Sequence, residues 1–180
     1  MIPLAAHRFA FVLVFSSIAC AQAQDRAPDP KSISIDLDHI LRGGINRRGE
    51  LVGLHHQPSA PESMTYQNKS CELWFMYSSD GGPNDVRTAR VELRDPKTQK
   101  VLLEKFSTLY PKAWTEPQIE AAIREAFADA LDRKQVDSDG RWEGRTKSGI
   151  RIDGFLSSDR SSISSAFPVY IRPRNDQKRR

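Results

Sequence analysis

The sequence predicts an α+β fold with antiparallel sheets, a hairpin and at least one packed amphipathic helix. Apolar residues recur at helical spacing between residues 119 and 131, two strand-like runs flank a turn at residues 95–98, and further strand-like runs fill residues 141–170. Helical spacing places apolar side chains on one stripe, whereas short apolar runs between turns are typical of strands. About 155 residues remain once a leader is removed, which is enough for one compact domain.

The composition is that of a soluble globular protein. Charged residues make up 28% of the 180 residues and hydrophobic residues 38%, unlike a membrane protein or a disordered chain. The formal net charge is +4, of which Arg8 in the leader contributes one. A mild positive charge raises the encounter rate with polyanions such as RNA, although this signal alone does not establish nucleic-acid binding.

The N-terminus has the features of a secretory signal peptide. His7 and Arg8 precede the apolar run 9–15, which is too short to span a bilayer as a helix, and residues 21–23 (Ala-Gln-Ala) supply a small-x-small cleavage site. We therefore expect residues 1–23 to be removed on export and residues 24–31 to form a proline-rich linker. The mature protein is then secreted or periplasmic, with no stable membrane insertion.

A second processing route stays open at Cys20. Residues 17–20 (Ser-Ile-Ala-Cys) resemble a lipoprotein signal in which this cysteine is acylated, but Ser17 stands where a large aliphatic residue is usual, so we rank the route second. Either way Cys71 has no partner within the mature chain, which excludes a disulfide-stapled fold. We expect Cys71 to be a small buried residue.

The first half of the domain contains short elements. Residues 32–38 alternate polar and apolar side chains, which fits a half-buried strand, although the same run could open a short helix near its aspartates. Prolines and serines between residues 57 and 68 indicate a loop. The aromatic-rich run 71–77 predicts a strand or part of a packed insertion, ended by a turn at residues 80–84.

The second half holds the strongest patterns. Residues 86–93 and 100–106 flank an Asp-Pro-Lys-Thr turn and predict a hairpin. The helix begins after Thr115, whose capping box with Gln118, together with Pro117 in the first turn, marks its N-terminus.

Three strand-like runs close the domain, at residues 141–146, 149–156 and 161–170, and we expect them to form an antiparallel sheet against the helix. We place the folded domain at residues 32–171. Residues 172–180 hold five basic groups and one acidic group. We interpret them as a solvated tail whose charge can steer a polyanion.

Histidines gather near the start of the domain. His39, His55 and His56 are three of the four histidines, and they lie in a stretch rich in glycine and arginine. Histidine has an unperturbed pKa of about 6.5, so it gives and takes protons near neutral pH. Two such groups on loops suggest acid–base chemistry. Arg47 and Arg48 between them are typical of an exposed turn, though they could hold substrate phosphates.

Six motifs follow one another along the chain. They are a His-Ile-Leu-x-Gly segment, a Gly-x-His segment, a lysine ahead of Ser-Thr and an aromatic-Pro, a helix begun by Trp, a Trp-x-Gly segment, and a closing Ser-Ala-Phe-Pro-x-Tyr. Here they occupy residues 39–43, 53–55, 105–111, 114 with the helix after it, 142–144 and 165–170. In this order they resemble the bacterial EndoU endoribonucleases, over residues 32–171.

The resemblance implies a metal-independent endoribonuclease that cleaves single-stranded RNA, often at uridines, and leaves a 2′,3′-cyclic phosphate. In this chemistry a base removes the proton of the ribose 2′-OH, which attacks the neighbouring phosphorus, while an acid protonates the departing 5′-oxygen. A fixed ammonium offsets the charge that grows on the phosphoryl oxygens. By position the resemblance assigns His55 as the base, His39 as the acid and Lys105 as the ammonium. The two histidine roles could be reversed.

The resemblance also implies substrate contacts. Ser165 matches a hydroxyl that contacts the scissile region or the uracil. Phe167 stands where the eukaryotic and viral branches have tyrosine, so it supplies a π-face for stacking but no hydroxyl. The phenol here is Tyr170, which we expect to orient the ribose or stack on a base. Thr108 and His56, near the catalytic lysine and histidine, are further candidates.

We expect RNA as the substrate and no cofactor. Secreted bacterial nucleases of this kind look like toxins, which would have an immunity protein as partner, but a scavenger of extracellular RNA fits the sequence equally well. A metal-dependent nuclease could use His39, His55, His56 and Cys71, although their spacing fits no compact ligand motif and we assign no metal ligand. A non-catalytic RNA-binding or interaction module would keep the fold without turnover.

Overall fold

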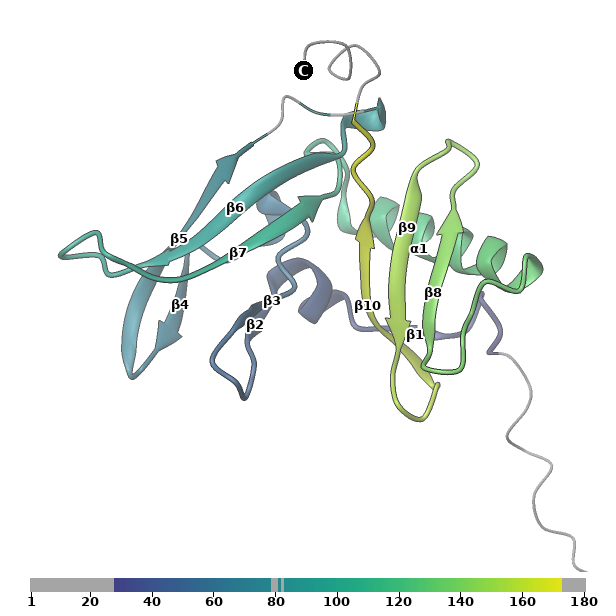
Figure 1. Ribbon diagram of the computed structural model, residues 1–180, viewed down its shortest axis with the longest axis horizontal. Helices are drawn as coiled ribbons and strands as arrows, with labels where there is room; N and C mark the ends of the chain where they lie inside the picture. Colours follow the sequence, from purple (N-terminus) through teal and green to yellow (C-terminus); the bar gives the residue numbers. More distant parts are fainter. Residues whose placement is uncertain (1–27, 79–80, 82, 173–180) are drawn as a thin grey trace, which may run out of the picture.

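The computed structural model describes residues 28–78, 81 and 83–172, and it contains two four-stranded sheets, a two-stranded ribbon and one α-helix. The predicted leader, residues 24–27 of the linker and the tail beyond Arg172 lie outside the described residues. One sheet lies with the helix at one end of the molecule, the other sheet lies at the opposite end, and the ribbon lies between them (Figure 1). The predicted α+β fold class is confirmed.

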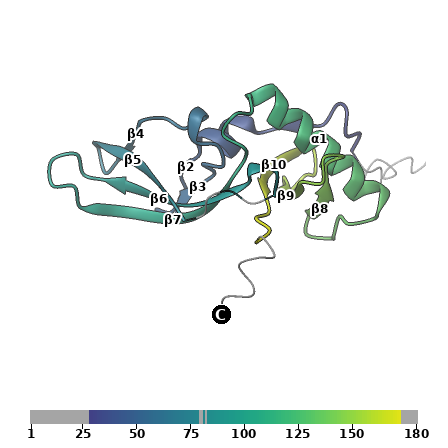
Figure 2. The ribbon, with the colours of Figure 1, turned by 90° about the horizontal axis from the view of Figure 1, so that it is seen from above.

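The C-terminal sheet has the strand order β1-β10-β9-β8. Strands β8 (Arg141–Arg145), β9 (Arg151–Leu156) and β10 (Ser162–Pro168) run antiparallel, as predicted, and β1 (Ser34–Ile35) joins the sheet parallel to β10. Helix α1 (Glu116–Asp132) covers one face of this sheet, and no described element covers the opposite face (Figure 2).

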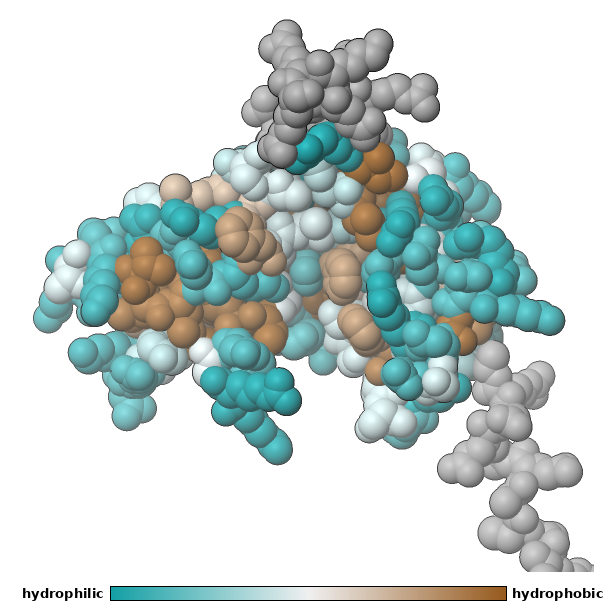
Figure 3. Space-filling view, in the orientation of Figure 1, coloured by the Kyte–Doolittle hydropathy of each residue, from teal (hydrophilic) through white to brown (hydrophobic). Residues whose placement is uncertain are grey.

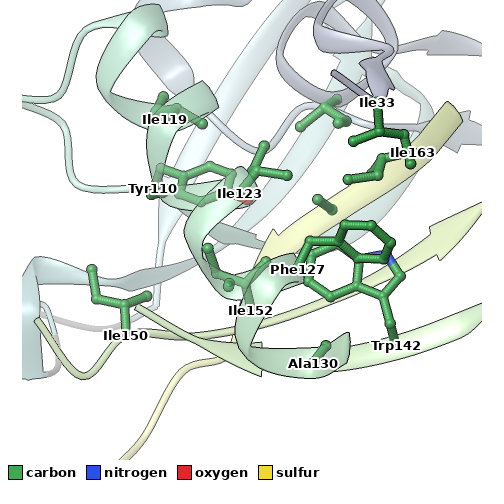
Figure 4. Close-up of a cluster of buried hydrophobic side chains, with 14 of the residues drawn as sticks. Ile33, Tyr110, Ile119, Ile123, Phe127, Ala130, Trp142, Ile150, Ile152 and Ile163 are labelled. Carbon is green, nitrogen blue, oxygen red and sulfur yellow. The ribbon is translucent and has the colours of Figure 1, made fainter. Parts of the chain in front are cut away.

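The α1 helix follows its sequence pattern. Thr115 is the N-cap, its backbone N–H donates to Gln118 Oε1 at 2.8 Å, and Pro117 lies in the first turn. The apolar stripe is buried against the sheet, where the rings of Phe127 and Trp142 meet edge to face at 5.3 Å (Figure 4). Each fully buried Ile or Phe stabilises the fold by about 1.5–3 kcal/mol, so this core holds α1 on the sheet.

The second sheet has the order β4-β5-β6-β7 and is antiparallel throughout. It consists of β4 (Ser63–Tyr66), β5 (Lys69–Tyr77), β6 (Arg87–Arg94) and β7 (Val101–Leu109). The β6–β7 pair is the predicted hairpin, and β5 is the strand predicted from the aromatic run. One face of the sheet packs on a separate core that contains Leu51, Leu54, Cys71, Val91 and Leu93, which confirms the buried position predicted for the cysteine.

The loop predicted for residues 57–68 is wrong in part. This stretch contains the short helix η2 (Gln57–Ser59) and strand β4. Gln67 and Asn68 have φ angles of 49° and 62°, the left-handed geometry of a two-residue hairpin turn, which pairs β4 with β5. Because neither turn residue is glycine, the composition gave no hairpin signal. A further short helix, η3 (Pro83–Asp85), links β5 to β6.

A connector of short elements joins the two sheets. It passes from β1 into the helical turn η1 (Asp38–Arg42) and through the ribbon of β2 (Gly44–Ile45) and β3 (Leu51–Val52). Both alternatives for residues 32–38 are therefore realised, as a short strand followed by the start of a helical turn. The turn of the ribbon carries the exposed Arg47–Arg48 pair, as predicted.

The two ends of the molecule differ at the surface. Figure 3 shows hydrophobic surface gathered over the end that holds β4–β7, and mainly hydrophilic surface over the end that holds β8–β10. Among the described residues, no helix combines the length and apolar character needed to cross a membrane.

Candidate active site

A pocket of about 610 Å³ lies where the two sheets and the connector meet. Strand β7 lines one side and β10 another, and the segment from η1 to the residues after β3 completes it. Six of the residues singled out in the sequence line this pocket: His39, His55, Lys105, Thr108, Ser165 and Phe167. They come from distant parts of the chain, so the tertiary fold brings them together.

His55 has a defined tautomer. Its Nδ1 lies 2.8 Å from the Thr108 carbonyl oxygen and 3.1 Å from Ser107 Oγ. A carbonyl oxygen can only accept, so Nδ1 carries the proton and donates it to Thr108. In the neutral ring, Nε2 then holds a free lone pair. The Phe167 ring stacks on the imidazole, with centroids 5.4 Å apart and planes at 25°.

The backbone at His55 is held on both sides. Its N–H donates to the Ile40 carbonyl oxygen at 3.0 Å, and its carbonyl oxygen accepts from the Tyr110 N–H at 2.8 Å. The preceding Leu54 is fully buried and has a φ of 63°. A left-handed conformation costs a residue with a Cβ about 1–2 kcal/mol, so the surrounding packing must enforce it. The strained residue therefore helps set the direction of the histidine.

His39 lies on η1, which is a wide turn. The Gly43 N–H donates to the Asp38 carbonyl oxygen at 3.1 Å, the i+5 to i spacing of a π-helix. The His39 backbone N–H donates to Asp36 Oδ1 at 3.0 Å. A Cβ on Gly53 would lie 1.8 Å from the His39 carbonyl oxygen. Only glycine fits there, so Gly53 sets the close approach of the two histidine-bearing segments.

Lys105 projects from β7 into the pocket. Its Nζ donates to the Gly53 carbonyl oxygen at 2.5 Å, which ties the ammonium to the segment just before His55. Burial lowers the pKa of Lys105 from its usual value to about 8. At neutral pH the side chain is therefore still mostly charged, although it has lost much of its hydration.

Burial also dominates the titration of His55. Desolvation lowers its pKa most, the charge of Lys105 and then His39 lower it further, and the Thr108 hydrogen bond opposes them, with a resulting pKa of about 3. The imidazole is therefore neutral at neutral pH. An anion bound beside Lys105 would offset the ammonium charge and raise the pKa of His55.

Strand β10 supplies Ser165 and Phe167. Side chains alternate along a strand, and Ala166 between them is buried in the core beneath α1, so its two neighbours face the other way. Both line the pocket, from the sheet opposite to the one that carries Lys105. The β10 side thus offers a hydroxyl and an aromatic face.

His56 and Tyr170 do not line the pocket. His56 is buried, its Nδ1 lies 2.8 Å from Ser59 Oγ, and burial lowers its pKa. Tyr170 follows β10 and packs against the core beneath α1. Substrate contact by these two side chains stays a prediction.

Among the pocket residues that were not singled out in the sequence are Ser107 and Phe106. Ser107 Oγ donates to the Leu54 carbonyl oxygen at 3.1 Å and lies 3.1 Å from His55 Nδ1, so it links the strained leucine to the histidine. The two-residue period of β7 places it on the same side as Lys105, and a longer predicted strand would have found it. Phe106 lines the pocket and is 76% exposed, which only the folded chain reveals.

The ligands considered for a metal site do not come together. Within residues 28–78, 81 and 83–172, no group of three or more His, Cys, Asp or Glu side chains is arranged so that it could hold a metal ion. Cys71 lies in the core of the β4–β7 sheet, and His56 lies outside the pocket that contains His39 and His55.

Two histidines, a half-buried lysine and an aromatic side chain around one pocket suit acid–base chemistry on an anionic substrate. Comparison with known proteins agrees with this, because the family described as bacterial EndoU nuclease matches residues 35–170. The chain belongs to the bacterial EndoU nuclease family, as its motif order predicted.

A relative from Bacillus cereus, named "Toxin", is 29% identical over 134 residues. The matched region is 74% of this chain and 22% of the relative, so the chain spans only a minor part of that protein. No solved structure matches the chain.

Proposed function

We propose that this nuclease is a metal-independent endoribonuclease that cleaves single-stranded RNA at uridines and leaves 2′,3′-cyclic phosphate ends. The observation that carries the proposal is the 2.8 Å hydrogen bond from His55 Nδ1 to the Thr108 carbonyl oxygen. It leaves a neutral imidazole with a free lone pair on Nε2. A neutral base is what removal of a 2′-OH proton requires.

Two proton transfers accompany the reaction, one from the substrate to the protein and one from the protein to the leaving group. The ribose 2′-OH gives its proton to His55 Nε2, and the 2′-oxygen forms a bond to the adjacent phosphorus. The bond from phosphorus to the 5′-oxygen of the next nucleotide breaks, and His39 gives a proton to that departing oxygen. The products are a 2′,3′-cyclic phosphate and a free 5′-hydroxyl.

Lys105 stabilises the charge on the non-bridging phosphoryl oxygens. Its ammonium is already fixed by the Gly53 carbonyl oxygen, so little reorganisation accompanies the reaction. The same ammonium helps to keep the pKa of His55 low in the free enzyme. A bound phosphodiester offsets this charge and raises the pKa of His55, so the base becomes stronger when the substrate is in place.

Residues on the β10 side of the pocket are placed to recognise the nucleobase. Ser165 offers a hydroxyl to the uracil edge or the scissile region, and Phe167 offers a π-face. Thr108 lines the pocket from β7 and can contact the same nucleotide.

The test compares an oligoribonucleotide that contains one uridine with the same oligomer carrying 2′-deoxyuridine at that position. The protein should cut the first to a cyclic phosphate in the presence of a chelator and leave the second intact. Equal cleavage of both would overturn the 2′-OH mechanism. Loss of activity with chelator would favour a metal-dependent nuclease, and binding without any cleavage would favour a non-catalytic RNA-binding module.

Two substitutions address the proton-transfer pair. His39→Ala and His55→Ala should each lower kcat by about 10²–10⁴-fold, the usual contribution of acid–base catalysis. Circular dichroism and thermal unfolding check that each variant is folded. Wild-type turnover by a folded His55→Ala protein would remove it from the mechanism.

We also propose that the protein is exported. The support is the signal-peptide pattern of residues 1–23. Mass spectrometry of the exported protein should find a chain that begins at Gln24. A lipid-modified chain that begins at Cys20 would instead establish the lipoprotein route.

The toxin of Bacillus cereus supports a role against other cells, with an immunity protein as partner. Expression of residues 24–180 in the cytoplasm of a test bacterium should arrest growth, whereas the His55→Ala variant should not. Normal growth with active enzyme present would favour the scavenging role.

A further inference from the structure

The open face of the C-terminal sheet continues directly from the pocket. Phe155 on β9 is the Cα partner of Arg141 on β8 and of Ser165 on β10, so these side chains form one row across three strands. Trp142 and Gly154 alternate with them and face α1, since a Cβ on Gly154 would meet the Trp142 ring. The row therefore lies on the uncovered face and begins at a residue that lines the pocket.

Phe155 is an exposed aromatic ring at the middle of this face. It is 41% exposed, and no described element covers it. An apolar ring in this position gains free energy when a partner removes it from water. Next to it lies a second row, in which Asp153 is the partner of Phe167, the ring that stacks on His55. A ligand that extends from the pocket along the sheet therefore reaches Phe155.

The charge of the face suits a polyanion. Its strand residues include three arginines, Arg141, Arg145 and Arg151, and two carboxylates, Glu143 and Asp153.

The arginines differ in how firmly the carboxylates hold them. Arg151 lies 3.1 Å from Asp153 and 3.2 Å from Glu143. Arg141 lies 3.6 Å from Asp153, and its side chain is 57% exposed. The Arg141 guanidinium can therefore turn to a phosphate without breaking a short ion pair.

We propose that this row is a second nucleotide subsite, in which the base next to the cleaved nucleotide stacks on Phe155 and a phosphate binds Arg141. The proposal rests on the proposed function, because it takes RNA as the substrate. Aromatic side chains on an open sheet bind single-stranded RNA without sequence preference, because every base has a π-face. Adjacent strands are about 4.8 Å apart, so this subsite lies one strand away from Ser165.

The open face of the β4–β7 sheet offers a matched control. Trp74 is 44% exposed, close to the value for Phe155, but the Arg94 guanidinium lies over its ring at 5.1 Å. The buried Glu92 pairs with Arg90 at 2.6 Å and with Arg94 at 2.5 Å. Glu72 and Glu104 lie on the same face. The strand residues of this face therefore include three carboxylates but only two arginines, Arg90 and Arg94. The strand positions around Trp74 therefore suit a polyanion less well than the row that holds Phe155.

The test measures binding by fluorescence anisotropy, with an RNA octamer that carries 2′-deoxyuridine at the cleavage position and so is not cut. Phe155→Ala should weaken binding by about 5- to 100-fold, the loss expected for one stacked base, and Phe155→Trp should restore it. Trp74→Ala should stay within about 2-fold, because Trp74 lies on the open face of the β4–β7 sheet, where carboxylates outnumber arginines.

A single-nucleotide substrate separates the subsite from the pocket. Uridine 3′-(4-nitrophenyl) phosphate has one base, so Phe155→Ala should cleave it like the wild type. Equal octamer binding by wild type and Phe155→Ala would overturn the subsite while leaving the ribonuclease intact. If the wild type neither binds the octamer nor cleaves the ester, both proposals are overturned.

Arg141→Gln gives an independent measurement if Phe155→Ala also disturbs the pocket. Loss of one phosphate contact should reduce the slope of log Kd against log salt concentration by about 0.7. An unchanged slope would overturn the role of this face in RNA binding.

Discussion

The β7 and β10 sides of the pocket carry different kinds of groups. From β7 come the Lys105 ammonium and the Thr108 carbonyl oxygen that sets the His55 tautomer, whereas β10 presents the hydroxyl of Ser165 and the ring of Phe167. The ammonium and the group that sets the His55 tautomer thus lie with one sheet, whereas the hydroxyl of Ser165 and the ring that stacks on His55 lie with the other. Because each sheet has its own core, substitutions on the two sides should change turnover and binding separately.

On the β7 side, Lys105→Ala should have the largest effect. It removes a positioned charge from the transition state, so kcat should fall by about 10²–10³-fold with a much smaller change in KM. Steady-state kinetics on a uridine oligomer measure this. Lys97→Ala, in the exposed turn of the β6–β7 hairpin, removes the same charge at a distance and should behave like the wild type. A rise in KM alone would assign Lys105 to binding.

Gly53→Ala tests the close approach of the segment before His55 to the turn that carries His39. Its added Cβ would lie 1.8 Å from the His39 carbonyl oxygen at a φ of 64°, so the variant should lose more than about 10-fold in kcat and about 1 kcal/mol or more in unfolding free energy. Gly49→Ala is the control, because its φ is 79° but its Cβ would meet nothing within 4 Å. It should lose stability and keep its turnover. Full turnover by Gly53→Ala would show that this close approach is dispensable.

The alkaline limb of the pH dependence should include the loss of the Lys105 charge on the β7 side. Lys105 loses its charge above its pKa of about 8, so this group should add a factor of about ten per pH unit to the fall of kcat/KM above that value. The arginine of Lys105→Arg stays charged, so any activity that this variant retains should persist to higher pH. Profiles that fall at the same pH in both proteins would exclude Lys105 as the group that titrates.

Unfolding does not explain such a fall. The folded-state pKa of Lys105 is lower than its ordinary value of 10.5, so between about pH 8 and 10.5 the unfolded chain binds more protons than the folded one. The Lys105 contribution to stability therefore rises with pH across this window, while activity falls. Thermal unfolding over the same pH range distinguishes the two effects.

The smallest effect should come from the β10 side. Phe167→Ala removes a stacking face, so KM should rise by about 5- to 10-fold with little change in kcat. It also lets water reach the His55 ring, which should raise the pKa of His55 above about 3 in an NMR titration. A loss of kcat as large as that of Lys105→Ala would contradict the assignment of turnover to the β7 side and binding to the β10 side.

Local sequence patterns predicted the elements that depend on neighbouring residues. The α1 stripe with its Thr115 cap and the β6–β7 hairpin around a proline turn were both correct. Strand β4 was missed, because its pairing depends on left-handed Gln67 and Asn68, which few sequences signal without glycine. The parallel pairing of β1 with β10 joins distant segments, and no local pattern encodes it.

Some of the candidate site could likewise be predicted from local motifs, and some could not. Motif order was enough to name the six residues that the structure gathers around the pocket, because each motif is local in the chain. It also named Tyr170 and His56, which do not line the pocket: Tyr170 packs against the core beneath α1, and His56 is buried. Substrate contact by these two side chains stays a prediction, because a place near a site residue in the sequence does not by itself put a side chain in the pocket.

By itself, the sequence determined the α+β class, the resemblance to the EndoU family and the identities of the histidines, lysine and serine. Only the tertiary structure decided the protonation of His55, the depressed pKa of Lys105 and the continuation of the pocket toward Phe155. The physical reason is that residue type and spacing are local properties. A tautomer, a desolvated charge and a row across strands depend on atoms that folding brings from other segments of the chain.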